Sequence, residues 1–269
     1  MSGFSADWLA LREPFDLRAR SPAVLDAVAS FFEHQSSVRV IDLACGTGST
    51  LRALSPGLPP RQSWTLVDKD PNLLARAAST PTSQDVTVTV VARDLSDDLE
   101  PALRGAVDLV ATSALLDLVS DAWLHRVVIA VTARAIPFYA ALSYDGRVAF
   151  TPPDPSDAAV VGAVNTHQRT DKGFGAALGP AAADVALTRF AALGYTVVQG
   201  AADWQIEPED RDMQNALVDG WARAACDIGT LSTQDITGWL ARRRATIAAG
   251  QSSLLVGHLD FFAVPSATR

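Results

Sequence analysis

The stretch from Val38 to Leu51, VRVIDLACGTGSTL, limits the fold more than any other part of the chain. It begins with β-branched residues typical of a buried strand, turns through Gly46 and Gly48, and continues as an apolar segment compatible with a helix. A strand, a glycine turn and a helix in this order form the nucleotide-binding start of a doubly wound α/β domain. Asp42 then lies at the end of a strand, where open α/β sheets bind their ligands.

The charge of this turn bears on the kind of ligand. A dinucleotide-binding turn uses three glycines, whereas Ala44 occupies the first position here. A pyrophosphate beside the carboxylate of Asp42 would be repelled by about 1–4 kcal/mol per charge pair at ~4 Å. S-adenosylmethionine (SAM), which carries an ammonium and a sulfonium but no phosphate, would be attracted. The alternative is a tight turn that binds no ligand.

The stretch resembles the first motif of class I SAM-dependent methyltransferases, an acidic residue followed by a glycine-rich turn. The resemblance extends by motif over roughly residues 38–145. It implies SAM as the cofactor and S-adenosylhomocysteine as the product. The cofactor contacts that it implies in this turn are Asp42, Ala44, Cys45, Gly46, Thr47 and Gly48.

Three further strand ends match the same family. Asp68, with Lys69 beside it, follows the predicted strand 64–67, where an acidic residue accepts both ribose hydroxyls in the family. Asp94 and Leu95 follow the strand 86–91 and are expected at the adenine, although Asp94 could instead cap a helix. Ser113 follows the strand 107–111 and is expected near the methionine part of SAM. Adenosine contacts of this kind do not by themselves distinguish SAM from NAD.

The composition argues against several classes of partner. The chain has 269 residues, a net charge of −8 and a pI of about 4.9, which argues against nucleic-acid binding. Two cysteines make a structural disulfide improbable and fit a cytoplasmic protein. No segment of the sequence is apolar and long enough for a membrane span. We therefore expect a small-molecule substrate, no nucleic acid or membrane partner, and a monomer or homodimer.

Residues 1–35 precede the first strand, and we interpret them as a helical lid over the cofactor. Pro14 is expected to interrupt any single helix there, and a second helix is expected to begin at Ser21-Pro22. Arg12 and Arg20 are candidates for substrate binding. The alternative is a helical layer that only covers one face of the sheet.

Substrate recognition and catalysis are predicted after strands four and five. Asp117 is an acid flanked by apolar residues after strand four, although it could be a solvated acid at a helix start. Residues 152–180 form a polar insertion, in which His167, Arg169, Lys172 and Phe174 could hold an anionic or polyhydroxylated substrate; the alternative is an exposed loop. Asp117 and His167 are the candidate general bases. Asp145-Gly146 predicts a hairpin turn after strand five.

The remaining chain completes the expected domain, residues 36–269, with a helical addition at about residues 207–250. The resemblance implies a Rossmann-like α/β fold with a seven-stranded sheet in the order 3-2-1-4-5-7-6 and strand seven antiparallel. We interpret His34, His125 and His258 as structural, and no cluster has the spacing of a metal site. The predicted function is methyl transfer from SAM to a small polar, anionic metabolite. The alternatives are an NAD-dependent oxidoreductase of Rossmann type and a non-catalytic SAM-binding regulatory protein.

Overall fold

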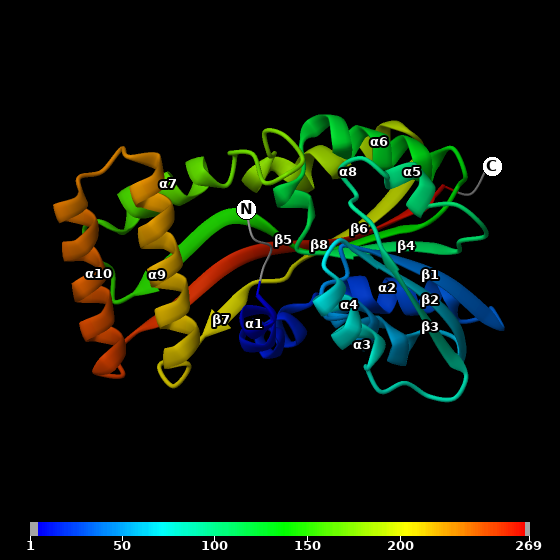
Figure 1. Cartoon of the computed structure of the whole chain (residues 1–269), viewed down its shortest axis with the longest axis horizontal. Coiled ribbons are helices and arrows are strands. Elements are labelled where there is room, and N and C mark those ends of the chain that lie inside the picture. The colour runs from blue at the N-terminus through cyan, green and yellow to red at the C-terminus, as the bar shows by residue number, and fades with distance from the viewer. Residues whose placement is uncertain (1–4, 267–269) are drawn as a thin grey trace.

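A computed structural model describes residues 5–266 of the chain as one α/β structure built on a central sheet (Figure 1). The strand order is β3-β2-β1-β4-β5-β8-β6, with the short β7 paired to β8. The strands are β1 (Ser37–Leu43), β2 (Arg61–Asp68), β3 (Val86–Ala92), β4 (Leu109–Ser113), β5 (Phe138–Thr151), β6 (Tyr195–Ala201), β7 (Trp204–Ile206) and β8 (Ser253–Pro265). Strands β1 to β5 pair in parallel, and β8 is antiparallel to β5, β6 and β7. The predicted order is confirmed, with β8 as the seventh strand and β7 as an addition.

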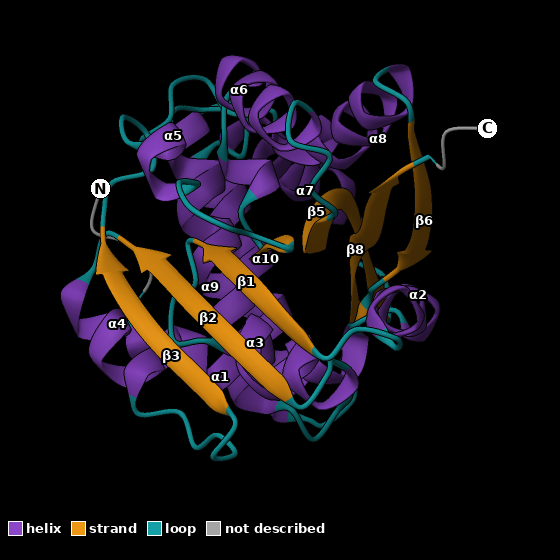
Figure 2. Cartoon of the chain, turned by 90° about the vertical axis from the view of Figure 1, so that its right-hand side faces the viewer, coloured by secondary structure: helices purple, strands orange, loops and turns teal. Residues whose placement is uncertain are grey.

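Helices cover both faces of the sheet, as Figures 1 and 2 show. The helices on one face are α2 (Pro22–Phe32), α3 (Ser49–Leu54) and α4 (Pro71–Ala78). The helices on the other face are α5 (Leu99–Ala102), α6 (Asp121–Thr132) and α8 (Ala182–Ala192). Each face has its own apolar core, and β1 contributes to both because alternate side chains point to opposite faces. The carboxyl ends of β1 to β4 therefore meet at one edge, between two packed layers.

A third core lies beyond that edge, where β5 and β8 run past the other strands (Figure 1). The helices packed there are α7 (Asp157–His167), α9 (Arg211–Ile228) and α10 (Thr233–Ala248). The helical addition predicted at about 207–250 is therefore the pair α9 and α10. No helix within residues 5–266 is both long and apolar enough to cross a membrane.

The hairpin predicted at Asp145-Gly146 is wrong. Strand β5 continues through these residues to Thr151 and stays paired with β8, with an irregular register between Tyr144 and Val148. The Asp145 carboxylate accepts the Arg147 amide at 2.9 Å, which forms a local turn inside the strand. The long partner strand therefore overrides the local turn signal.

The predicted insertion at residues 152–180 is also more ordered than a polar loop. Its first part is helix α7, whose Val160 and Val164 are buried in the third core. The polar residues that follow α7 run back to the sheet before the short 3-10 helix η3 (Gly179–Ala181). The irregular parts of the insertion are residues 152–156 and the segment between these two elements.

The break predicted at Pro14 is wrong as well. Helix α1 (Ala6–Ala19) continues through Pro14, and Ser5 caps it by accepting the Trp8 amide at 3.1 Å. A proline inside a helix costs about 3 kcal/mol because one backbone hydrogen bond is lost. Burial of Phe15 and of the ion pair between Arg12 and Asp16 on the inner face of α1 offsets that cost.

Candidate functional site

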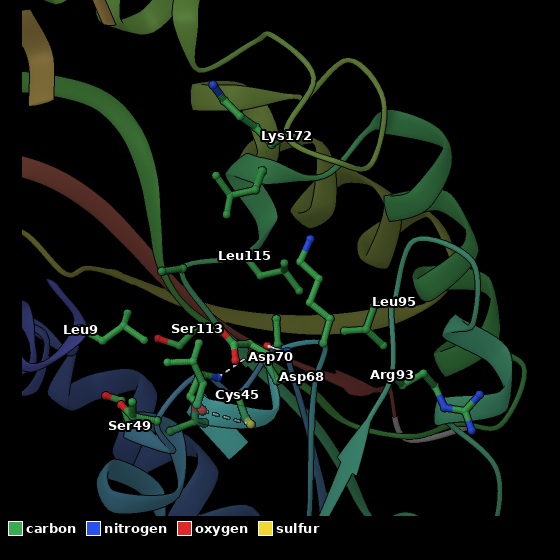
Figure 3. Close-up of a pocket in the computed structure, with 18 of the residues that line it drawn as sticks. Leu9, Cys45, Ser49, Asp68, Asp70, Arg93, Leu95, Ser113, Leu115 and Lys172 are labelled. Carbon is green, nitrogen blue, oxygen red and sulfur yellow. Dashed lines mark hydrogen bonds between the residues drawn. The ribbon is translucent and has the colours of Figure 1, made fainter. Parts of the chain in front are cut away.

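The first cavity, of about 190 Å³, lies at the carboxyl ends of β1 to β4 (Figure 3). We call it the cofactor cavity. Residues that the sequence assigns to the cofactor and that line this cavity are Ala44, Cys45, Gly46, Thr47, Asp68, Lys69, Asp94, Leu95 and Ser113. Gly48 and Asp42 do not line it. Leu9 and Arg12 of α1 also line it, and the lid role of residues 1–35 stays a prediction.

The turn after β1 is shaped by left-handed backbone at three alternate residues. Ala44 has φ = +54°, Gly46 has φ = +54° and Gly48 has φ = +86°. Glycine takes such values without steric cost, whereas alanine does not. A side chain at Gly46 would also lie 3.2 Å from Leu9 of α1. Helix α1 therefore packs closely over the turn.

Asp68 fastens this turn to β2. Its two carboxylate oxygens accept the Gly46 amide at 2.9 Å and the Asp70 amide at 3.0 Å. A carboxylate has about four lone-pair sites, so Asp68 keeps acceptor capacity toward the cavity. The residue can thus hold the turn and bind a ligand hydroxyl at the same time.

Asp42 lies beneath the turn, with an exposed fraction of 0 %. Within residues 5–266 neither carboxylate oxygen has a hydrogen-bond partner. Burial raises the pKa of Asp42 to about 8, although Thr50 and Arg20 oppose the rise. The expectation of direct cofactor contact is corrected, because the buried side chain does not line the cavity, and with this pKa its carboxyl group is mostly protonated near neutral pH.

Asp94 shows that its two predicted roles are compatible. One carboxylate oxygen accepts the amide of Ser96 at 3.0 Å and its hydroxyl at 2.8 Å, and these bonds lower the pKa of Asp94. The same side chain lines the cofactor cavity, with its other oxygen available to a ligand. Leu95 is buried beside it and forms part of the cavity wall.

A second cavity, of about 370 Å³, adjoins the first, and we call it the acceptor cavity. The two cavities share the lining residues Arg12, Lys69, Ala114, Leu118 and Lys172. The aromatic side chains of its wall are Trp8, Tyr144, Trp204 and Trp221. Its titratable groups beyond those shared are Asp117, His167, His258 and the phenol of Tyr144. It is therefore a mainly apolar space with a few polar groups.

Asp117 lies in the acceptor cavity on the 3-10 helix η2 (Leu116–Leu118). Only 6 % of its surface is exposed, and its Oδ1 atom has no hydrogen-bond partner among residues 5–266. Burial raises the pKa of Asp117 to about 6, against the opposing effects of its own backbone amide, Arg12, the Tyr144 amide and Lys172. The interpretation as a solvated acid is therefore wrong. A carboxylate of this kind can take up a proton near neutral pH.

His167 and Lys172 meet at the rim of the same cavity. Lys172 Nζ lies 3.2 Å from His167 Nδ1 and donates to the Thr170 hydroxyl at 3.0 Å. An ammonium can only donate, so Nδ1 of His167 is the acceptor, and its Nε2 faces Asp227 at 3.6 Å. Burial lowers the pKa of both residues, and Lys172 lowers that of His167 further.

Three of the predicted substrate residues lie elsewhere. Arg169 is exposed, lines neither cavity and donates to the Asn165 carbonyl at 3.3 Å. Phe174 lines the cofactor cavity and packs edge-on against Trp123 with a centroid distance of 5.5 Å. Arg20 lines neither cavity. The insertion thus divides, with His167 and Lys172 at the acceptor cavity and Arg169 on the surface.

Arg12 and Arg20, the two arginines predicted to bind substrate, differ in what their side chains can contact. Arg20 donates to the Tyr139 hydroxyl at 2.9 Å and to the hydroxyls of Ser113 at 3.2 Å and Ser49 at 3.5 Å. Arg12 pairs with Asp16 through its Nε and Nη2 atoms and lies between the two cavities. Arg20 can therefore position cofactor-cavity residues, whereas only Arg12 can reach a ligand.

The sequence analysis missed the aromatic wall and His258. Trp8, Trp204 and Trp221 come from α1, β7 and α9, which are far apart in the sequence. Tyr144 and His258 lie on the long antiparallel pair β5 and β8. No local motif joins these residues, so no signal in the sequence places them together.

Comparison with known proteins agrees with this geometry. The family model described as "Methyltransferase domain" matches residues 40–135. No curated protein matches the chain. A cyclopropane-fatty-acyl-phospholipid synthase-like protein from Lactobacillus casei is 15 % identical with a TM-score of 0.51, over 98 % of this chain and 95 % of that one.

Two other solved structures show similar arrangements. A candidate methyltransferase from Bacillus halodurans is 14 % identical with a TM-score of 0.50, over 90 % of this chain and 99 % of that one. A SAM-dependent methyltransferase from Thiobacillus denitrificans, in complex with S-adenosylhomocysteine, is 15 % identical with a TM-score of 0.45, over 98 % of this chain and 100 % of that one. At these identities the likeness concerns the fold alone.

Proposed function

We propose that the chain is a SAM-dependent methyltransferase, since residues 40–135 match the methyltransferase-domain model, and that it methylates a small molecule held in the acceptor cavity. The observation that carries this proposal is the junction of the two cavities. They share Arg12, Ala114 and Lys172, so ligands in the two spaces would meet there. Holding two reactants in contact is the main contribution that a protein makes to such a displacement.

The lining of the cofactor cavity fits SAM. Asp68 would hold the ribose hydroxyls, Asp94 would accept the adenine amino group, and Ser113 would lie at the methionine part. Asp42 below the turn has a pKa of about 8 and is mostly protonated near neutral pH in the unliganded site, and a cationic ligand above the turn would favour its ionised form. When bound, SAM supplies a methyl group on a positively charged sulfur. The chain itself supplies orientation and the binding charges.

The acceptor cavity supports a more specific substrate than the sequence indicates. Its aromatic wall fits a planar apolar body, which differs from the small polar metabolite that the sequence predicts. Lys172 and Arg12 at the junction would still attract a negative charge on that body. We infer a planar acceptor with a hydroxyl or amino nucleophile and room for an anionic group.

Asp117 is the proposed general base. The residue lines a mainly apolar cavity, its buried Oδ1 is unpaired within residues 5–266, and burial raises its pKa to about 6, near the working range of a base at neutral pH. It would take the proton of the acceptor hydroxyl or amine as the new bond to the methyl carbon forms. Lys172 would then stabilise the negative charge that develops nearby.

His167 takes a supporting role in this scheme. Its Nδ1 accepts from Lys172, so that lone pair is not available to a substrate. Asp227 lies 3.6 Å from the opposite nitrogen, beyond hydrogen-bond distance. We therefore propose that His167 positions Lys172 and that Asp117 alone acts as the base.

Calorimetric titration tests the cofactor part of the proposal. SAM and S-adenosylhomocysteine should bind, and NAD should bind at least a hundredfold more weakly, about 2.8 kcal/mol. NAD binding of equal strength would contradict it and favour the oxidoreductase alternative. Mass spectrometry of planar hydroxyl and amine compounds incubated with enzyme and SAM should then find a product heavier by one methyl group.

A further inference from the structure

His258 is a buried histidine that faces the acceptor cavity. It lies on β8, only 4 % of its surface is exposed, and it lines the cavity together with Tyr144 and Trp204. Its ring packs on Trp204 with a centroid distance of 4.6 Å and meets Tyr144 edge-on at 6.1 Å. Its backbone amide donates to Asp203 at 3.1 Å. The imidazole is thus held in one place within the wall.

The hydrogen bond of the ring fixes its tautomer. Nδ1 lies 3.0 Å from the carbonyl oxygen of Val256, and a carbonyl can only accept, so Nδ1 carries the proton. Burial and the nearby charges of Arg12 and Arg147 lower the pKa of His258 to about 3. The imidazole is therefore neutral near neutral pH, and Nε2 keeps its lone pair.

The lone pair on Nε2 of His258 accepts no hydrogen bond from the described part of the protein. Within residues 5–266 no donor forms a hydrogen bond to Nε2. The guanidinium of Arg12, which also lines this cavity, directs its Nε and Nη2 atoms to Asp16. The acceptor cavity thus presents a fixed hydrogen-bond acceptor within an aromatic wall.

We propose that His258 is a specificity-determining residue, whose Nε2 accepts a hydrogen bond from a hydroxyl or N–H group on the planar body of the methyl acceptor. This inference rests on the proposed function, because it concerns the substrate of the same site. A site built to accept a hydrogen bond rejects a molecule of the same shape that lacks the donor, since its buried acceptor then stays unpaired. The acceptor class is therefore a planar aromatic molecule that carries such a donor.

Indole and benzofuran form a matched pair of probes. They have the same bicyclic shape, but benzofuran has an oxygen in place of the indole N–H group. Calorimetry on the full chain saturated with S-adenosylhomocysteine should show indole binding at least tenfold more tightly than benzofuran. Equal binding of the two probes, or no binding of either, would overturn the proposal.

Two variants locate the preference. His258→Phe should reduce the indole preference to twofold or less, whereas His258→Gln, which keeps an acceptor oxygen, should retain most of it. His34→Phe at an exposed position is the matched control and should behave as the wild type. If the preference for indole persists in His258→Phe, the indole N–H group binds another acceptor, such as Asp117, and the proposal is overturned.

Two further measurements keep the test decisive if His258→Phe does not fold. Nitrogen-15 spectra of the wild-type ring should show an unprotonated Nε2 whose signal moves when indole is added, and an unmoved signal would contradict the proposal. Titration of S-adenosylhomocysteine into the same samples separates the two levels of inference. Failure of that titration contradicts the proposed function, whereas normal cofactor binding without an indole preference contradicts only the role of His258.

Discussion

The cofactor cavity and the acceptor cavity are neighbours, but the chain builds them differently. Most of the cofactor cavity comes from the ends of consecutive parallel strands, each of which is followed by a short run of lining residues. The acceptor cavity draws on α1, η2, β5, α7, β7, α9 and β8, from Trp8 to His258. A site made from strand ends can be found from local motifs. A site made by packing distant elements cannot.

Strained backbone lies where the two regions meet. Ala114 follows β4 with φ = +51° and lines both cavities, and Leu142 in β5 has φ = +54° and lines the acceptor cavity. The Leu142 amide donates to Asp260 at 2.7 Å, and the other oxygen of Asp260 accepts the Ser21 amide at 3.0 Å. Left-handed conformation at such residues costs about 1–3 kcal/mol each and persists only where packing enforces it. Asp260 thus stabilises the irregular part of β5 that shapes the acceptor cavity.

Asp117→Asn should give the largest difference between the two cavities, because it should impair methyl transfer and leave cofactor binding intact. Loss of the base is expected to lower kcat/KM for methyl transfer at least a hundredfold, about 2.7 kcal/mol, with S-adenosylhomocysteine affinity within twofold. A base must be deprotonated, so wild-type activity should fall as pH drops through about 6, and the residual activity of the variant should lack that step. Asp97→Asn at an exposed position is the control. A pH profile unchanged in the variant would rule out Asp117 as the base.

Asp68→Ala tests the cofactor cavity alone. Hydrogen bonds to a charged group contribute about 1.5–3 kcal/mol, so calorimetry should show SAM affinity reduced by that amount. The thermal unfolding midpoint should fall by only a few degrees, because the amides of Gly46 and Asp70 lose their acceptor. Asp85→Ala, on an exposed residue before β3, should leave both unchanged. If the midpoint collapses while affinity is retained, Asp68 serves only to hold the amides of Gly46 and Asp70.

Lys172 and Arg169 provide an internal comparison within the insertion. Lys172→Ala is expected to lower kcat/KM about tenfold, about 1.4 kcal/mol, because the ammonium at the cavity junction is lost. Arg169→Ala, three residues earlier on the surface, should have no effect on steady-state kinetics. Equal effects of the two changes would show that the insertion acts through its total charge and not through one placed group.

Ala44→Gly should give the smallest effect and the opposite sign. Glycine relieves the left-handed strain at φ = +54°, so urea unfolding should show a free energy of unfolding that is higher by about 0.5–1 kcal/mol. The greater flexibility of glycine in the unfolded chain reduces this gain. Ala102→Gly within α5 is the control and should destabilise, because glycine weakens a helix. Destabilisation by Ala44→Gly would mean that the methyl group of Ala44 packs usefully in the core.

The local errors of the sequence interpretation have a common cause. Pro14 and Asp145-Gly146 are breaking signals whose local preference is overridden by long-range packing, of α1 on its inner face and of β5 along β8. In the same way, Asp42 was expected in the cavity because it follows a strand. The side-chain direction along β1 instead buries it beneath the turn.

The α/β class, the strand order implied by the family resemblance and most of the residues that line the cofactor cavity could be predicted from the sequence, because parallel strands bring their carboxyl ends to one edge whatever else the chain does. Asp117, His167 and Lys172, predicted separately for catalysis or substrate binding, all line the acceptor cavity. Packing of the folded chain was needed to show that Arg169 lies outside, that tryptophans from three elements form the wall, and that Nε2 of His258 meets no donor within residues 5–266. These properties depend on which distant side chains pack together and which hydrogen bonds are already taken, and neither is encoded in local spacing.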